Sequence, residues 1–479
     1  MKYRNIGYLI GVIMMIEAAL LVSPTIVSLI YKESTIPFLI TIAVLMILSL
    51  PLVVFKPKNF ELYAKDGFVA VAGSWIVMSI FGALPFVISG SIPNYINALF
   101  ETVSGFTTTG ATILTEIESL PRGILFWRSQ THWIGGMGVI ILMLAITQSV
   151  GAQTIHVMRA EMPGPTKGKL VPKLRQTAII LYGIYIVLSL IMVAVLLLCG
   201  LPLYDSIINM FGTAGTGGFS VLNDSIAGYN SPLVEWVIAV FMIIFGINFN
   251  LYYFILIRRA KEVVRNEELR AYLGILIIAT AIITANILSM FDGFGEAVRT
   301  AFFQVASIIS TTGFSIANIE VLPSLSKSIL ALLMFTGACA GSTAGGLKLS
   351  RVIIIIKGMF ANVKKILRPN SVNVIKLNGE VVPDTTVRAA TNYFSLYALI
   401  LAVGTILVSV DGLDITSNFT SVITCLNNVG PTYGSLGIVG NLSAYSDFST
   451  VVLSFVMLFG RLEIMPMLIM LSPSTWKKH

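Results

Sequence analysis

The sequence is poor in charged residues. Only 11% of its 479 residues are Asp, Glu, Lys or Arg, whereas 56% are hydrophobic. A soluble domain carries about 25% charged residues, so this composition excludes an ordinary soluble protein. Apolar runs of about 20 residues, the length that an α-helix needs to cross a bilayer, recur along the chain. The sequence therefore predicts an all-α polytopic protein embedded in the lipid bilayer.

Cysteines and enzyme motifs are also scarce. The three cysteines, Cys199, Cys339 and Cys425, lack the paired spacing typical of metal sites. The sequence contains no HExxH zinc motif, nucleophile elbow or phosphate-binding P-loop. The first apolar run is too long for a signal peptide and lacks a small-residue cleavage site. Because the catalytic and phosphate-binding motifs are missing, we expect neither an enzyme nor a tightly bound organic cofactor.

What the sequence does contain is a short loop that occurs four times. In chain order, loops 1 to 4 are residues 107–112 (TTTGAT), 216–220 (TGGFS), 311–315 (TTGFS) and 428–432 (NVGPT). Each follows a short helix-compatible segment and precedes a long apolar run. The repeated unit is therefore a span, a half-helix, a loop and a second span.

The apolar runs predict about ten spans, of which two precede the repeats. The predicted spans are 6–31, 36–55, 67–89, 126–147, 178–198, 233–257, 272–290, 329–356, 389–410 and 450–471. The predicted half-helices are 94–104, 204–212, 297–309 and 417–426. We divide the chain into two leading helices (1–60) and four pore repeats: 61–155, 156–265, 266–375 and 376–479.

The net charge of +8 follows from an uneven distribution of Lys and Arg. These residues lie between consecutive repeats, at 156–175, 258–270 and 357–376, and at both termini, whereas the opposite ends of the spans are richer in Asp and Glu. The positive-inside rule places the basic segments and both termini in the cytoplasm. The charge then reflects membrane topology, not nucleic-acid binding. The same segments could also dock a cytosolic protein.

Irregular backbone cannot face lipid, because its unsatisfied N–H and C=O groups are costly there. The four loops must therefore face one another or a water-filled cavity. Around one axis, their carbonyl oxygens would form rings that can replace the hydration shell of a monovalent cation. Glycine permits the necessary backbone angles, and the half-helices would point their partially negative C-terminal ends at the cavity. The arrangement favours a cation over an anion.

Three further segments make the chain specifically similar to one family. They are residues 126–138 (FWRSQTHWIGGMG), 337–348 (GACAGSTAGGLK) and 427–431 (NNVGP). With the four repeats, they resemble the Trk/Ktr/HKT superfamily of potassium transporters over nearly the whole chain. The two leading helices resemble the TrkH branch more than the shorter KtrB branch.

This resemblance implies a potassium filter with one glycine in each loop. The implied filter residues are Thr108, Thr109, Gly110, Thr216, Gly217, Gly218, Thr311, Thr312, Gly313, Asn428, Val429 and Gly430. In the family, serine at the position of Gly110 goes with sodium permeation, so glycine there favours potassium. Loop 4 departs most, with Val429 and Pro431, and we expect its geometry to differ.

The small residues within 337–346 predict a break in a long apolar helix, because glycine weakens helices. The resemblance implies that this segment gates the pore; close helix packing through small residues is the alternative. The implied gating residues are Gly337, Gly341, Ser342, Thr343, Gly345, Gly346, Lys348 and Arg461. Lys348 could instead extend to the cytoplasmic edge.

Arg461 lies deep in the last predicted span, where a charge costs about 2.5–3.5 kcal/mol. It should face the pore or a partner, and the resemblance makes it a positive barrier to ions. An ion pair with Glu463 or a contact with backbone carbonyls remains open. Arg128 and His132 share one helix face, and we interpret His132 as a packing residue more readily than as a proton carrier.

The favoured function is potassium uptake through a pore, either passive or coupled to H+ or Na+. An alternating-access cation symporter and a non-conducting sensor are the alternatives. The resemblance implies a homodimer in the cell (inner) membrane with a cytosolic nucleotide-binding regulatory subunit of the TrkA type. No nucleotide-binding fold is recognisable in the sequence itself, and no nucleic-acid partner is expected.

Overall fold

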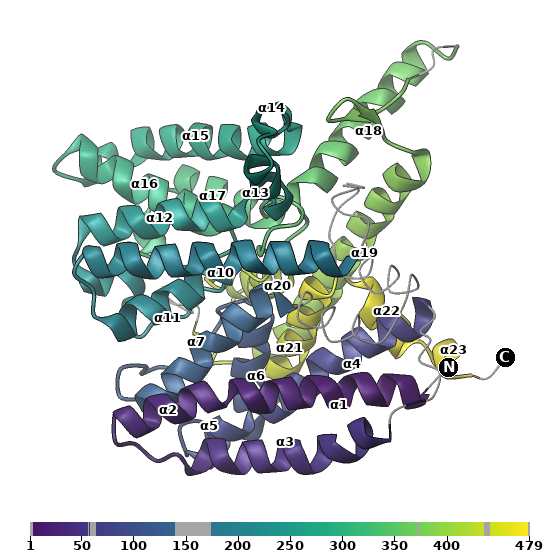
Figure 1. Cartoon of the computed structure of the whole chain (residues 1–479). Helices are drawn as coiled ribbons and strands as arrows, with labels where there is room; N and C mark the ends of the chain where they lie inside the picture. The colour runs from purple at the N-terminus through teal and green to yellow at the C-terminus, as the bar shows by residue number, and fades with distance from the viewer. Residues whose placement is uncertain are drawn as a thin grey trace.

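The computed structural model describes residues 3–55, 57, 64–138, 174–370, 373–434 and 441–477. Within these ranges the chain is predominantly helical, which confirms the predicted class (Figure 1). The strands of the described part form one antiparallel hairpin, β1 (Lys376–Leu377) and β2 (Glu380–Val381). Most of the predicted basic segment at 156–175 lies outside the described residues.

Two helical hairpin arms precede the repeats. The first is α1 (Tyr3–Leu20), extended by α2 (Val22–Ile30), and the second is α3 (Ile36–Val54). Helix α1 packs against α3 and against the first helix of repeat 1. The outer face of α3 exposes large apolar side chains, as a lipid-facing helix must: Ile36, Leu39, Ile40, Ile47 and Leu48.

The remaining helices form four successive groups with the same order. Group 1 contains α4 (Ala64–Gly82), α5 (Leu84–Ile88), α6 (Tyr95–Phe106) and α7 (Arg122–Gly136). Group 2 contains α10 (Leu174–Leu198), α11 (Leu203–Ala214), η2 (Ser225–Tyr229), α12 (Pro232–Gly246), α13 (Phe249–Leu256) and α14 (Ala260–Arg265). Group 3 contains α15 (Glu267–Ile287), η3 (Leu288–Met290), α16 (Phe294–Ile309), η4 (Ile319–Val321), α17 (Ser324–Thr336) and α18 (Leu349–Leu367). Group 4 contains α19 (Asp384–Val408), η5 (Ser409–Asp411), α20 (Ile415–Asn427), α21 (Asp447–Arg461), α22 (Met465–Leu471) and α23 (Pro473–Trp476).

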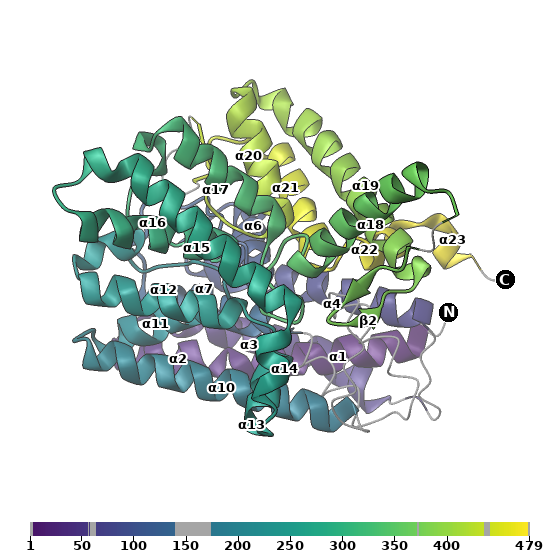
Figure 2. The same ribbon diagram turned by 90° about the horizontal axis from the view of Figure 1, so that it is seen from above.

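The four predicted half-helices are confirmed as α6, α11, α16 and α20. Their C-terminal halves are almost completely buried. The longer helices α10, α15 and α19 lie around them (Figure 2). The protein therefore holds the ends of the half-helices, and the loops that follow, away from lipid.

Six described helical segments are long and apolar enough to cross a membrane, and the bent pair α12–α13 makes a seventh, with an 89° bend. We predicted about ten spans. The predicted span 126–147 continues beyond the described residues, and the predicted break in 329–356 is confirmed at 337–348. The continuous spans predicted at 233–257 and 450–471 are wrong, because each is interrupted.

Local chemistry explains both unexpected interruptions. After Gly246, Asn248 caps the next helix, since its side chain accepts a hydrogen bond from the Asn250 amide. After Arg461, Pro466 lies in the first turn of α22, where its missing N–H is tolerated. Both new helix starts are therefore encoded in the sequence, although the apolar composition hides them.

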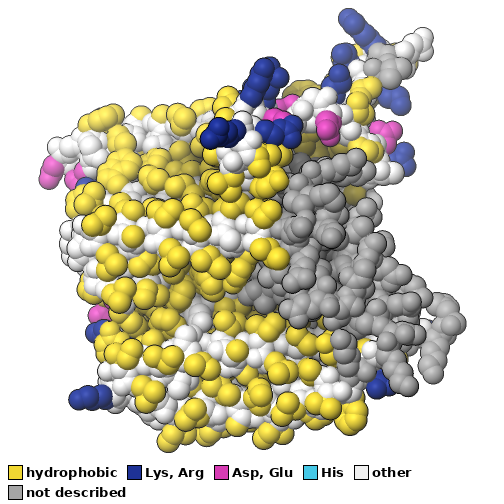
Figure 3. All heavy atoms as spheres, in the orientation of Figure 1, with side chains coloured by type: hydrophobic (Ala, Val, Ile, Leu, Met, Phe, Trp, Pro, Cys, Tyr) yellow, Lys and Arg dark blue, Asp and Glu magenta, His cyan; other side chains and the backbone are white. Residues whose placement is uncertain are grey.

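Hydrophobic side chains cover the flanks of the molecule, and Lys and Arg gather around α14 and α18 (Figure 3). The start of α1 lies beside the end of α23, because the rings of Tyr3 and Trp476 stack with centroids 6.3 Å apart. Both ends of the described chain thus lie close together.

Candidate functional site

Each half-helix ends in the same way. The amide of the residue that follows a left-handed residue donates to a carbonyl five residues back: Thr109 to Ser104, Gly217 to Gly212, Thr312 to Ser307 and Val429 to Thr424, at 2.8–3.0 Å. This closure requires a left-handed residue at the helix end. The four loops therefore begin from one shared backbone geometry.

The left-handed position is occupied by Thr108, Thr216, Thr311 and Asn428, with φ between 52° and 57°. Two residues later comes a glycine, Gly110, Gly218, Gly313 or Gly430, with φ of 79°, 79°, 82° and 102°. Loop 4 keeps this pattern despite its different sequence. A β-branched residue with positive φ is strained, and such strain concentrates at functional sites.

The glycines show that the four loops form a closed ring. A Cβ on Gly110 would clash with the carbonyl oxygen of Gly217, one on Gly218 with that of Thr312, and one on Gly313 with that of Val429. A Cβ on Gly430 would lie 2.7 Å from the carbonyl oxygen of Thr109, which returns the contact to loop 1. Each loop therefore abuts the next around a common axis, and glycine is required for space as well as for its φ.

A cavity of about 30 Å³ borders this ring. Residues of all four loops line it, including Gly110, Gly218, Gly313 and Pro431. That volume corresponds to about one water molecule. All twelve sequence-predicted filter residues belong to the four loops, and three of them, Gly110, Gly218 and Gly313, line this space.

A buried ion pair supports the ring from behind. Arg128 of α7 donates to Glu101 of α6 at 2.6 Å, and both side chains are buried. Glu101 also accepts hydrogen bonds from Thr112 and from the Ile113 amide. The guanidinium of Arg128 lies 3.5 Å from the ring centroid of Phe219 in loop 2. The pair therefore connects loops 1 and 2, and sequence analysis missed Glu101 because nothing in the sequence paired it with Arg128.

His132, also predicted on this face of α7, packs between the first two loops. Its Nδ1 lies 2.8 Å from the carbonyl oxygen of Gly105, and its ring lies 4.0 Å from that of Phe219. A Cβ on Gly217 would clash with the imidazole. These contacts agree with the packing interpretation.

A second layer of contacts joins the broken helices. The guanidinium of Arg461 donates to the carbonyl oxygens of Thr343 at 2.8 Å, Gly135 at 2.6 Å and Gly136 at 3.3 Å. The Cys339 amide donates to Gly246 at 3.2 Å. The end of α7 is thereby connected to α21 and to the 337–348 loop, and that loop to the break after Gly246, because carbonyls freed by a helix end need new donors.

The contacts of Arg461 decide between the alternatives that the sequence left open. Its guanidinium contacts backbone carbonyls, whereas Glu463 pairs with Arg351 of α18. The structure places the guanidinium of Arg461, at the end of α21, between the end of α7 and the 337–348 loop. Sequence analysis could not identify Arg351 as the partner of Glu463.

The 337–348 loop contacts the ring of loops directly. The Gly345 amide donates to the hydroxyl of Thr311 at 2.8 Å, and a Cβ on Gly345 would clash with the carbonyl oxygen of Asn427. Gly337, Gly341 and Gly346 all have positive φ. Thr343 reaches across to Arg461. The 337–348 loop therefore contacts the ring through Gly345 and contacts Arg461 through Thr343.

Lys348 does not extend to the edge of the molecule, so that alternative was wrong. Its side chain is buried, and its ammonium donates to the carbonyl oxygen of Ala344. The break in the helix leaves carbonyls without intrahelical donors, and this acceptor lies within the reach of the side chain. The side chain of Lys348 is thus held against the backbone of the 337–348 loop.

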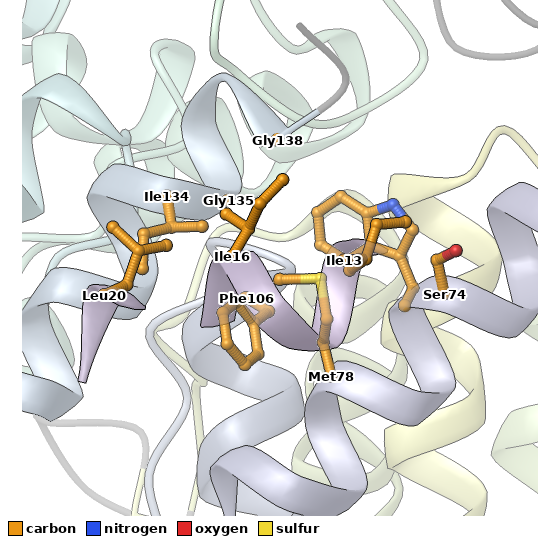
Figure 4. A pocket seen from close by; sticks show the side chains of 10 residues that line it. Ile13, Ile16, Leu20, Ser74, Met78, Phe106, Ile134, Gly135 and Gly138 are labelled. Atoms are coloured by element: carbon orange, nitrogen blue, oxygen red, sulfur yellow. The ribbon is translucent and has the colours of Figure 1, made fainter. Parts of the chain in front are cut away.

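Another small cavity, also of about 30 Å³, lies between α1, α4, α6 and α7. Figure 4 shows Ile13, Met78 and Phe106 around it, with Gly135 beside them. Its lining is apolar apart from Ser74, whose hydroxyl already donates to Ala70. This cavity offers no set of oxygen ligands, so it is not an ion site.

Comparisons with known proteins agree with this architecture. A family model described as TrkH, a cation transport protein, matches residues 34–478. The chain is 35% identical to the Trk system potassium uptake protein TrkH of Salmonella typhimurium, over 100% of both chains. It is 32% identical to the Trk system potassium uptake protein TrkG of Escherichia coli, over 99% of both. The crystal structure of the potassium transporter TrkH from Vibrio parahaemolyticus superposes with a TM-score of 0.90, at 31% identity over 100% of both chains.

Proposed function

Since this chain belongs to the TrkH family of cation transport proteins, we propose that it takes up potassium ions across the cell membrane through the ring of four loops. The observation that carries this proposal is the ring of contacts in which each of the four loops abuts the next. A common axis is what a carbonyl-lined ion path requires, and scattered loops could not supply it.

In this proposal, backbone oxygens of the twelve filter residues replace the water around a K+ ion. Loops 1 to 4 contribute Thr108, Thr109, Gly110, Thr216, Gly217, Gly218, Thr311, Thr312, Gly313, Asn428, Val429 and Gly430. The strained threonines and positive-φ glycines hold those oxygens in position before the ion arrives. The ion is cargo, and its selectivity follows from how the ring of oxygens replaces hydration.

The 337–348 loop is the proposed gate. It lies directly against loops 3 and 4, and it is fastened to Arg461 from the other side. An ion that left the ring would meet this loop and two cationic side chains, Arg461 and Lys348. Release of the loop would therefore open the path, and the positive charges would raise the barrier while it stays closed.

The proposed orientation places both termini and the basic segments in the cytoplasm of a multi-pass protein of the cell (inner) membrane. The stacking of Tyr3 on Trp476 and the Lys and Arg side chains around α14 and α18 support it. On that face we propose a cytosolic nucleotide-binding regulatory subunit of the TrkA type, and we propose that the transporter is a homodimer. We keep the division into 1–60, 61–155, 156–265, 266–375 and 376–479.

An alternating-access symporter coupled to H+ or Na+ is the second candidate. Its broken helices usually come from paired inverted repeats. Here the described parts of the four groups share one order of long helix, half-helix, loop and further helix. That common order favours a pore.

Rubidium uptake tests the proposal in a bacterial strain that lacks its own potassium uptake systems. The wild-type protein should restore growth at low potassium and take up Rb+ against excess Na+. Gly110→Ser should make Na+ a stronger competitor, because serine at this position of loop 1 goes with sodium permeation in the family that the chain resembles. Gly183→Ser is the matched control, since a Cβ at Gly183 meets nothing within 4 Å. No Rb+ uptake by the well-folded wild type would refute the proposal; uptake abolished by collapsing the ion gradients would favour the symporter.

A further inference from the structure

Two consecutive carboxylates at the start of α15 have different partners. Glu267 and Glu268 occupy the first turn of this helix, after the cap residue Asn266. Acidic residues are common there because they suit the helix dipole. In this protein, however, both side chains bind other parts of the chain.

Glu268 holds the 337–348 loop at both ends. Its side chain is 2% exposed, and its Oε1 accepts hydrogen bonds from the amides of Ala340 at 2.7 Å and Ser350 at 2.9 Å. The Leu349 amide also donates to Ala338, which closes the loop on itself. Hydrogen bonds from N–H groups to a carboxylate are stronger than neutral ones. One buried oxygen therefore fastens the start of the loop to the start of α18.

Glu267 holds the β1–β2 hairpin. Its carboxylate accepts from the Asn378 amide at 3.1 Å, and its own amide donates to the Asn378 side chain at 2.7 Å. Lys357 of α18 pairs with the same carboxylate and donates to the Lys376 carbonyl at 2.8 Å. The hairpin is thus fastened to the turn of α15 that carries Glu268.

The hairpin also has space on one side. A cavity of about 700 Å³ separates residues of the hairpin, among them Asn378 and Glu380, from Phe254 and Arg259 of the α13–α14 region. Asn248, which lies against Gly341 of the 337–348 loop, borders the same cavity. The hairpin could therefore move into this cavity without clashing with packed side chains, and its movement would pull on the first turn of α15.

We propose that Glu267 and Glu268 mechanically link the β1–β2 hairpin to the gate, with Glu268 as the positioning residue that keeps the 337–348 loop beneath the ring. This inference rests on the proposed role of that loop as the gate. A movement imposed on the hairpin loosens Glu268 from Ala340 and Ser350, and the loop is then free to leave the ion path. Static capping of α15 alone would not need bonds to two other elements.

Rubidium influx into proteoliposomes containing the full-length protein tests the link. Glu268→Ala should raise basal influx about tenfold, because hydrogen bonds to a charged group are lost from the closed arrangement. Glu268→Gln should restore most of the closure, since its amide oxygen can still accept both N–H groups. Asn378→Ala and Glu267→Ala should each raise influx less. The double variant of Asn378→Ala with Glu267→Ala should raise influx little more than the stronger of the two single variants, because both substitutions remove the same Glu267–Asn378 contact.

Glu380→Gln is the matched control. It removes a carboxylate from the same hairpin, and this carboxylate makes no described contact with α15. Its influx should equal that of the wild type. Hydrogen exchange gives a readout independent of ion flux. The amides of Ala340 and Ser350 should exchange faster in Glu268→Ala, and unchanged exchange together with wild-type influx would overturn the link.

Deletion of residues 341–346 separates the two proposals. If this deletion raises influx but Glu268→Ala and Glu268→Gln behave alike, the gate stands and the link is wrong. If neither the wild type nor the deletion variant conducts Rb+ while both remain folded by size-exclusion chromatography, the pore proposal fails and the link fails with it. A folded Glu268→Ala protein with reduced influx would also overturn the link.

Discussion

Replacing Gly218 with alanine tests the closed ring most directly. Gly218 has a φ of 79°, and a Cβ there would clash with the carbonyl oxygen of Thr312 in loop 3. The substitution is small, but it acts at a contact between two loops. It should therefore change the ring without removing any charged group or hydrogen-bonding side chain.

The expected cost has two parts. A left-handed backbone costs an alanine about 1–2 kcal/mol relative to glycine. Displacing a packed neighbour adds about 1–3 kcal/mol. The sum of about 2–5 kcal/mol divides between the stability of the fold and the ion path, and about 1.4 kcal/mol on the path alone lowers the flux tenfold. We therefore expect Rb+ flux to fall at least tenfold.

Proteoliposome Rb+ flux and thermal unfolding in detergent together measure this effect. Gly183→Ala is the control, because Gly183 lies within α10 and its Cβ would meet no atom within 4 Å. Alanine there should keep wild-type flux and raise stability by up to about 1 kcal/mol. If Gly218→Ala conducts like the wild type, the ring of loops does not form the ion path and the reasoning is wrong.

The remaining predictions concern groups around the ring. Arg461→Ala should raise basal Rb+ influx into proteoliposomes, because the carbonyls of Thr343, Gly135 and Gly136 lose their common donor; an unchanged influx would remove Arg461 from the barrier. Arg128→Ala should lower the unfolding free energy by about 3–5 kcal/mol, because Glu101 is left buried without its partner, and thermal unfolding should show a smaller loss for the double variant with Glu101→Ala. Glu17→Gln should keep or raise the unfolding temperature, because neither carboxylate oxygen of this buried residue has a hydrogen-bond partner among the described residues; a clear drop would indicate a partner that the described contacts lack.

The loops could be predicted from sequence because their signals are local. A glycine after small or hydroxylated residues, between a helix-forming segment and an apolar run, indicates a turn wherever it occurs. Four such turns at matching places indicated a repeat. The half-helices α6, α11, α16 and α20 followed from the same pattern and from hydrophobic length.

The interruptions at Gly246 and after Arg461 could not be predicted from apolar composition. A helix can stop inside a membrane protein only where other groups satisfy the freed N–H and C=O groups. Here those groups come from elsewhere in the chain: the Cys339 amide donates to the Gly246 carbonyl, and the side-chain amide of Asn428 donates to the Met457 carbonyl near the end of α21. The 337–348 break was predictable because its own glycines weaken the helix.

Sequence alone determined the membrane class, the four repeated loops and the family resemblance, because each depends on residues that are close together along the chain. Only the tertiary structure decided which loop contacts which, that Arg461 binds carbonyls while Glu463 binds Arg351, and that Lys348 stays buried. Those contacts join residues that are distant in sequence. A buried polar group must find a hydrogen-bond partner, and the packing of the helices decides which partner lies within reach.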